Sequence, residues 1–260
     1  MKQLLKLGLA AMLLLYVAGC NATQTMFGFS FRERQRIKEA KSLIARKYEL
    51  PDLLFYKSDE ITGAGCSPGL VKDDKEYLPD DFPKEKYANH YLILLNSMEK
   101  HVESFRKDSK QPIHLRWHVP YKRPMVSTVT HEIDHTYFHR LSDEEKKSLI
   151  ALCKEIDESL PEKNKEHKGH ASYYSYFWSF MPAELRKKEQ AAEPACAVVG
   201  SELVEIKGDD NFSFNESATN EQLTEALTYF ILDHKYMSDD PLFQKKLNAY
   251  LKIMERFEKK

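Results

Sequence analysis

The sequence has almost no net charge and only one long hydrophobic run. Its 260 residues include 39 Lys and Arg against 40 Asp and Glu, a formal charge of −1. A chain without a basic excess has no electrostatic basis for binding a polynucleotide, so nucleic acid is not expected as a partner. The mean hydropathy of −0.58 argues against a protein with many membrane spans. Internal repeats and low-complexity segments are also absent, and 42% hydrophobic residues suffice for one globular domain or two small ones.

The hydrophobic run lies at the N-terminus. Residues 1–19 contain two lysines, no acidic residue and an apolar stretch from Leu7 to Val17 that is too short to span a bilayer comfortably. This pattern predicts a secretion signal. The small residues that lead into Cys20, in the order Val17-Ala18-Gly19-Cys20, resemble the lipobox of bacterial lipoproteins.

The lipobox resemblance implies that the chain is cleaved before Cys20 and that its sulfur receives diacylglyceryl. The mature lipoprotein has 241 residues, the 260 less the first 19, and is held to a membrane by N-terminal acyl chains such as palmitate. Asn21 is not the aspartate that marks retention in the inner membrane of diderm bacteria. The expected location is therefore the cell envelope, and the outer membrane if the host is diderm.

Cysteine is scarce in the remaining chain. Lipidation of Cys20 leaves Cys66, Cys153 and Cys196, an odd number, in an oxidising compartment. We expect one disulfide and one free thiol, and the sequence does not tell which pair forms. No CxxC spacing suggests a cysteine metal site.

Hydrophobic periodicity and capping signals predict an α+β fold that is mainly helical with a small sheet. Residues 60–86, rich in Gly and Pro, are expected to be loop, and alternation over residues 113–119 predicts a half-buried strand. Capping boxes at Ser142 and Thr219 and the pair Asp240-Pro241 mark expected helix starts. The predicted helices cover residues 31–48, 87–105, 127–141, 143–158, 220–232 and 241 onward.

The chemistry concentrates in residues 131–135, His-Glu-Ile-Asp-His, which form the HExxH arrangement. On a helix, His131 and His135 lie one turn apart on the same face and can both bind a single Zn²⁺. Glu132 lies at the edge of that face, where its carboxylate can accept a proton from a metal-bound water. These three residues are the strongest candidates for a metal site and its catalytic base.

A catalytic zinc usually has three protein ligands, so a third one is needed. The metzincin motif HExxHxxGxxH would need glycine at position 138 and histidine at position 141. The chain has Phe138 and Leu141, so it is not a metzincin. His139 continues the series, but three histidines on successive turns span about 12 Å, too far for one ion with bonds of roughly 2 Å.

A better third ligand lies downstream, in the helix predicted over residues 220–232. Here Glu221 and Glu225 share a face, and the run from Glu221 to Leu232 reads ExxxEAxxYxxL. A helical HExxH followed by such a glutamate helix resembles the gluzincins, and more narrowly the anthrax lethal factor catalytic-domain family. The resemblance covers roughly residues 110–258. It implies a zincin-like metallopeptidase domain with Glu221 as zinc ligand and Glu225 as a supporting carboxylate or alternative ligand.

One position departs from this family. Seven residues before the zinc glutamate the family has a tyrosine whose hydroxyl can stabilise the oxyanion, and here Phe214 stands in its place. Another donor would have to replace the hydroxyl, with His170, His234 and the tyrosines at 173, 174, 176 and 229 as candidates. The departure leaves open a non-catalytic zinc-binding envelope lipoprotein that acts as a binding or scaffold module.

A second resemblance is weaker. Peptide deformylases also carry HEIDH, and the segment Gly65-Cys66-Ser67-Pro68-Gly69 is similar to their GCLS segment, whose cysteine binds the metal. The leucine between Cys and Ser is missing, no GxGxAAxQ segment lies upstream, and a lipoprotein does not meet formylated nascent chains. We therefore set this interpretation aside.

The sequence thus predicts a membrane-anchored zinc metallopeptidase that hydrolyses peptide or protein substrates in the cell envelope or outside the cell. Its expected organisation is a signal peptide over residues 1–19, a lipidated tether over 20–30, an N-terminal helical and loop region over 31–109, and the zincin-like catalytic domain over 110–260.

Overall fold

The computed structural model describes residues 25–61, 65–102, 123–158, 216–232 and 241–260. The predicted signal peptide (residues 1–19), Cys20 and the predicted strand over residues 113–119 lie outside these ranges. The described strands are β1 (Met26–Phe27), β2 (Leu53–Lys57), β3 (Gly65–Leu70) and β4 (Tyr91–Leu95). The α-helices are α2 (Phe31–Ile44), α4 (Pro124–His139), α5 (Asp143–Glu158), α8 (Glu216–Ile231) and α9 (Pro241–Met254). Short 3₁₀ turns cover Lys75–Tyr77, Lys84–Tyr87 and Glu255–Phe257. The prediction of an α+β fold dominated by helix is confirmed.

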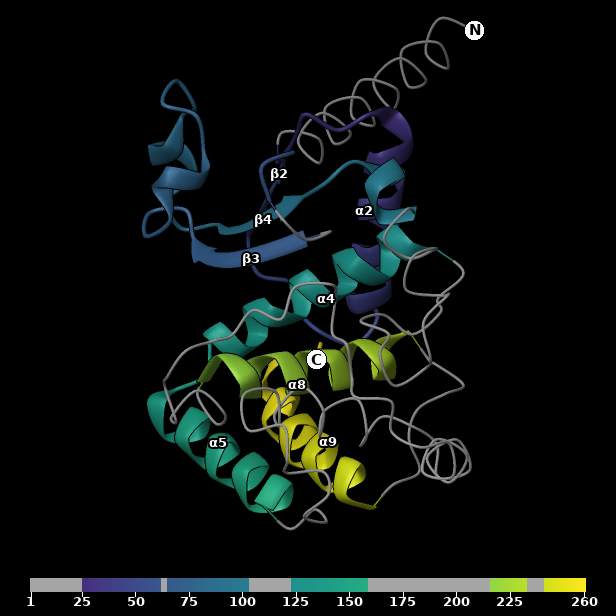
Figure 1. The fold of residues 1–260 in the computed structure, drawn as a ribbon, viewed down its shortest axis with the longest axis vertical. Coiled ribbons are helices and arrows are strands. Elements are labelled where there is room, and N and C mark those ends of the chain that lie inside the picture. Colours follow the sequence, from purple (N-terminus) through teal and green to yellow (C-terminus); the bar gives the residue numbers. More distant parts are fainter. Residues whose placement is uncertain (1–24, 62–64, 103–122, 159–215, 233–240) are drawn as a thin grey trace, which may run out of the picture.

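The four strands form one mixed sheet in the order β1-β2-β4-β3. β1, β2 and β4 are parallel, with Leu53 opposite Tyr91 and Lys57 opposite Leu95, whereas β3 pairs antiparallel with β4. Within the described residues β3 is therefore an edge strand, and it packs on the long helix α4, where Gly65 lies next to Glu132 (Figure 1).

The predicted helix over residues 87–105 is wrong for most of its length. Residues 91–95 form β4, and among the described residues of that range α-helix is found at 98–102. β4 is covered on both faces of the sheet, because its successive residues Leu92, Ile93, Leu94 and Leu95 are at most 1% exposed. Such a strand is a continuous apolar run, which periodicity alone does not distinguish from a buried helix.

The predicted loop over residues 60–86 is also partly wrong, because it contains β3 and two 3₁₀ turns. Gly65 and Gly69 lie in β3, and a register irregularity separates Cys66 from Gly69. Glycine and proline are typical of loops, but they also occur in edge strands and at bulges. β2 was not predicted at all.

Helix α2 confirms the first predicted helix, although it ends at Ile44. Ile37, Ala40 and Ile44 are fully buried, and Ser30 and Glu33 form a capping box at its start. Glu33 also accepts hydrogen bonds from the Lys57 ammonium group and from the backbone N–H of Met98, each at 3.0 Å. This one carboxylate therefore joins the start of α2 to the end of β2 and to the helical turn after β4.

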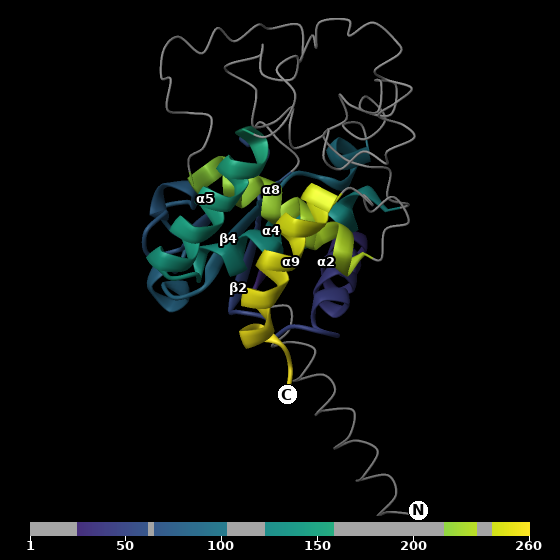
Figure 2. The same ribbon diagram turned by 90° about the horizontal axis from the view of Figure 1, so that it is seen from below.

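Helix α4 lies between the sheet and α2 on one side and the helices α5, α8 and α9 on the other (Figures 1 and 2). Its side chains belong to one large core that includes buried residues of β2, β4, α2, α5, α8 and α9. The predicted domain boundary lies at residue 110. The core contains residues from both sides of that boundary, so the described segments before and after it do not form separate cores.

The helices after α4 confirm two of the three predicted starts. At α5, Ser142 and Glu145 form the expected capping box, with hydrogen bonds of 3.3 and 2.8 Å, and α9 begins at Pro241 as predicted. The third start is wrong: α8 begins at Glu216, and Thr219 lies buried inside it. Among the helices of the described ranges, none has the length and apolar character needed to cross a membrane.

Candidate metal centre

Helix α4 carries the HExxH residues through the centre of the molecule. Twelve of its residues are buried, among them polar ones such as Thr130 and Thr136. Their hydroxyl groups donate to the carbonyl oxygens of Val126 and Ile133, so burial leaves these groups hydrogen-bonded within the helix. The helix is thus a rigid support for the side chains that it presents to the neighbouring pocket.

His131, His135 and Glu221 converge at the point where α8 crosses α4. Their nearest ligand atoms are separated by 3.1 Å between the two Nε2 atoms, by 3.3 Å from His131 Nε2 to Glu221 Oε2, and by 3.4 Å from His135 Nε2 to Glu221 Oε1. A tetrahedral ion with bonds of about 2.0 Å holds its ligands about 3.3 Å apart. The three residues therefore fit a single metal ion, and they are the group that the sequence predicted.

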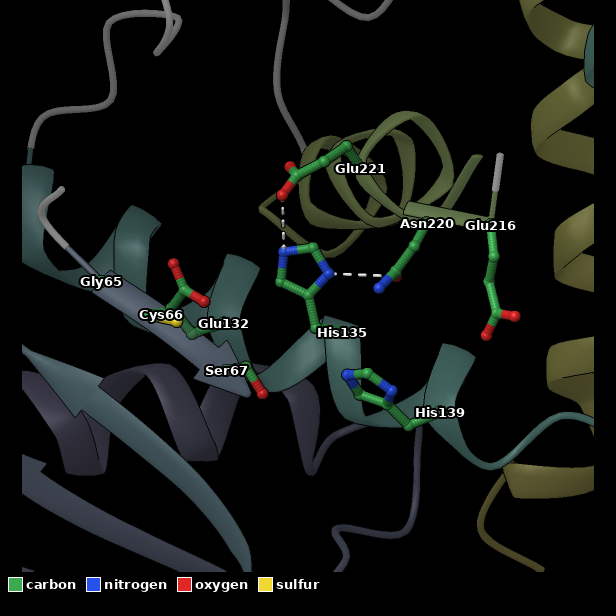
Figure 3. A pocket seen from close by; sticks show the side chains of 9 residues that line it. All are labelled: Gly65, Cys66, Ser67, Glu132, His135, His139, Glu216, Asn220 and Glu221. Carbon is green, nitrogen blue, oxygen red and sulfur yellow. Dashed lines mark hydrogen bonds and ion pairs between the residues drawn. The ribbon is translucent and has the colours of Figure 1, made fainter. Parts of the chain in front are cut away.

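The second nitrogen of His135 is held by helix α8. Asn220 Oδ1 lies 3.0 Å from His135 Nδ1, and it also accepts a hydrogen bond from the Thr224 hydroxyl group at 3.0 Å (Figure 3). An amide oxygen only accepts, so Nδ1 carries the proton and the Nε2 lone pair is left for a metal. Burial lowers the pKa of His135 to about 4, which keeps the ring neutral and able to bind a cation.

The second nitrogen of His131 contacts Glu225. Its Nδ1 lies 2.8 Å from Glu225 Oε2, and the Glu225 side chain is buried. Glu221 contacts the Nε2 atoms of both histidines, whereas Glu225 contacts the Nδ1 atom of His131. The two glutamates thus occupy different places, one beside the metal position and one behind a ligand, as the family resemblance implies.

Asp134 ties the two helices together from inside. It is fully buried, and its carboxylate accepts a hydrogen bond of 2.8 Å from Thr228 of α8. Burial raises the pKa of this carboxyl group well above its usual range. Asp134 therefore holds α8 against α4.

Glu132 lies in a pocket beside the metal position. The pocket is lined by β3, α4 and α8, with Gly65, Cys66 and Ser67 on one wall and Glu221 on the opposite one (Figure 3). Burial raises the pKa of Glu132 to about 8, an effect opposed by His131 and reinforced by Glu221 and Glu225. The pocket lies between the edge strand β3 and helix α8.

Gly65 makes room for the Glu132 side chain. A Cβ atom at position 65 would lie 2.7 Å from both Cγ and Oε1 of Glu132, much closer than van der Waals contact. Only glycine therefore lets β3 approach the carboxylate this closely. The sequence analysis predicted a loop over residues 60–86 and assigned Gly65 no role beside Glu132.

Cys66 is a free thiol in the pocket wall but does not belong to the metal-binding group. Burial and the neighbouring carboxylate of Glu132 raise the pKa of the Cys66 thiol to about 11, so it stays protonated at neutral pH. Cys153 is buried in α5, and Cys196 lies outside the described residues, so the expectation of one disulfide among the three cysteines stays a prediction.

The remaining candidates fall in different places. His139 lines the pocket but is not in the metal-binding group. Tyr229 packs with Ala226 and Leu247 in a small cluster and does not line the pocket. Phe214 lies outside the described ranges. So do the remaining candidate oxyanion donors, His170, His234 and the tyrosines at 173, 174 and 176. Sequence reasoning missed Asn220, although it directly precedes Glu221 and so shares its end of α8.

Comparisons with known proteins identify no family. No family model matches the chain, and neither the curated proteins nor the solved structures include a match.

Proposed function

We propose that this chain is a zinc-dependent peptidase in which His131, His135 and Glu221 bind the ion and Glu132 is the general base. The observation that carries the proposal is the spacing of the three ligand groups, 3.1 to 3.4 Å. It is supported by the hydrogen bond between Asn220 and His135 and by the Glu225 carboxylate, which lies 2.8 Å from His131 Nδ1. Nitrogen and carboxylate ligands at tetrahedral spacing favour Zn²⁺.

Bound zinc would polarise the substrate carbonyl group and lower the pKa of a bound water. Glu132 lies next to this position, where its carboxylate can take a proton from the attacking water and pass it to the leaving amine. Asn220 and Glu225 keep the Nδ1 protons of His135 and His131 in place, which holds both rings in the tautomer that leaves Nε2 free to bind.

The edge strand favours a peptide as substrate. β3 borders the pocket and presents an edge that no described strand covers, and an extended peptide can pair with such an edge through its own backbone. This pairing would lay a peptide bond across the metal position. The strand predicted from the sequence over residues 113–119 lies outside the described ranges, so the proposed peptide pairing is with β3.

The predicted signal peptide and the lipidation of Cys20 extend the proposal to an enzyme anchored in the cell envelope. Phe214 favours a second candidate, a non-catalytic lipoprotein that keeps the zinc site as part of a binding or scaffold module. The two candidates differ in catalysis and not in metal binding.

The test is to purify the chain from residue 21 onward, to determine its bound metals by mass spectrometry, and to measure cleavage of a diverse peptide library. We expect one zinc per chain and cleavage that falls at least about 10³-fold in Glu132→Gln, with the metal retained. Absence of bound zinc would contradict both candidates. Zinc without cleavage that depends on Glu132 would support the scaffold.

A further inference from the structure

The pocket beside the metal position contains polar atoms that have no partner. Ser67 Oγ and His139 Nε2 are both buried and make no hydrogen bond to any residue that the structure describes. Both residues line the pocket, as His135 does; Figure 3 shows Ser67 on the β3 wall and His139 on α4. Buried polar atoms are seldom left unpaired in folded proteins, so this corner of the pocket is built to receive a polar group.

His139 presents an acceptor to this corner. The ring hydrogen-bonds to the backbone of Ser67, and this contact favours the protonated form, as donation to a carbonyl oxygen does. Because Nε2 has no partner, the contact is made by Nδ1. Burial lowers the pKa of His139, so the ring is neutral at pH 7 and its Nε2 carries a lone pair.

Asn220 presents a donor to the same corner. Its Oδ1 is occupied by His135 Nδ1 and by the Thr224 hydroxyl group, so the NH₂ end of the amide is turned the other way. Figure 3 shows this end on the side of the pocket where His139 lies. The Ser67 hydroxyl group can donate or accept, and the corner therefore combines a fixed acceptor, a fixed donor and one adaptable group.

A primary carboxamide matches this arrangement, because its oxygen and its NH₂ group leave the same carbon and can meet a donor and an acceptor at once. A backbone peptide group points its N–H and C=O in opposite directions. An ammonium group cannot accept a hydrogen bond from the Asn220 NH₂ group. A carboxylate cannot donate a hydrogen bond to His139, and it would be repelled by the carboxylate of Glu216, which also lines the pocket.

We propose that the corner formed by Ser67, His139 and Asn220 binds the carboxamide of a glutamine or asparagine side chain in the peptide substrate. This inference rests on the proposed function, since it assumes a peptide in the pocket. It adds a preference for one side-chain chemistry close to the scissile bond.

The test measures binding, so it does not depend on turnover. Zinc-loaded Glu132→Gln protein is titrated, by fluorescence anisotropy, into labelled alanine-rich peptides that carry a single guest residue: Gln, Glu, Lys or Met. We expect the Gln peptide to bind about tenfold more tightly than the Met peptide, which has a similar shape, and than the charged ones. In His139→Leu this preference should fall to within about twofold.

His90→Leu is the matched control. His90 is also half-buried with an unpartnered ring nitrogen, but it packs on Tyr87 and does not line the pocket. It should retain the full preference for Gln. If His139→Leu does not fold, Ser67→Ala takes its place and should lose part of the preference.

The outcomes separate this inference from the proposed function. Equal binding of all four peptides, binding of none, or the same preference in His139→Leu as in its parent would overturn it. Library cleavage without a carboxamide preference would overturn it and leave the peptidase intact. A carboxamide preference in binding without any cleavage would support the recognition site and count against the enzyme.

Discussion

Replacement of Glu225 by glutamine tests whether the metal site is built as the structure indicates. Glu225 Oε2 lies 2.8 Å from His131 Nδ1, on the side of the ring opposite the metal position. Glutamine keeps the size of the side chain and removes its charge, so His131 becomes a less basic ligand and its ring is held less firmly. Loss of such a partner typically costs 10- to 100-fold in metal affinity, about 1.4 to 2.7 kcal/mol.

The same substitution at Glu221 removes a ligand and should have a larger effect, above about 100-fold. Glu216→Gln is the matched control, because Glu216 lies on the same helix and pairs with Lys146 at 2.6 Å but is not in the metal-binding group. It should change the affinity by less than about threefold, since a partly exposed charge is well screened.

The assay is competition for zinc against a chromophoric chelator near neutral pH, with circular dichroism to check that each variant is folded. The expected order of dissociation constants is wild type and Glu216→Gln, then Glu225→Gln, then Glu221→Gln. If Glu225→Gln binds zinc as tightly as wild type, the contact behind His131 has no energetic role. If it binds less tightly than Glu221→Gln, the two glutamates have been assigned the wrong places.

Two further predictions follow from single contacts. Gly65→Ala places a Cβ atom 2.7 Å from the Glu132 side chain, and a displacement of about 1 Å should reduce kcat about 10²-fold while zinc affinity stays the same; unchanged kcat would show that Glu132 does not need this space. Burial alone would raise the pKa of Glu33, but hydrogen bonds from Ser30, Met98 and Lys57 lower it to about 2 from 4.5. Because the folded-state pKa is the lower one, this carboxylate stabilises the fold above pH 4.5, by at most about 3 kcal/mol, and the contribution is lost as pH falls toward 2. Urea unfolding of Glu33→Gln should show a deficit at pH 7 that shrinks as the pH is lowered through this window, and a deficit independent of pH would contradict the charge argument.

Local signals predicted the elements whose ends are set by neighbours in the chain. The capping box at Ser142 and the proline at position 241 mark the starts of α5 and α9, because caps depend on residues within one turn. The box at Thr219 failed, since α8 begins three residues earlier and buries Thr219 against its neighbours. β4 was mistaken for helix because a strand covered on both faces loses the alternation that identifies strands.

For the site, the sequence alone determined that His131 and His135 share one face of a helix and that Glu132 stands beside them, because this follows from a spacing of four residues in a regular helix. Only the tertiary structure decided the rest. Which glutamate faces both Nε2 atoms depends on the rotation of α8 against α4, and the contact of Gly65 with Glu132 depends on where an edge strand passes over that helix. Gly65 and Glu132 are 67 positions apart in the chain and meet because core packing brings β3 and α4 together. Capping signals and hydrophobic periodicity describe only nearby residues, so they do not predict such a contact.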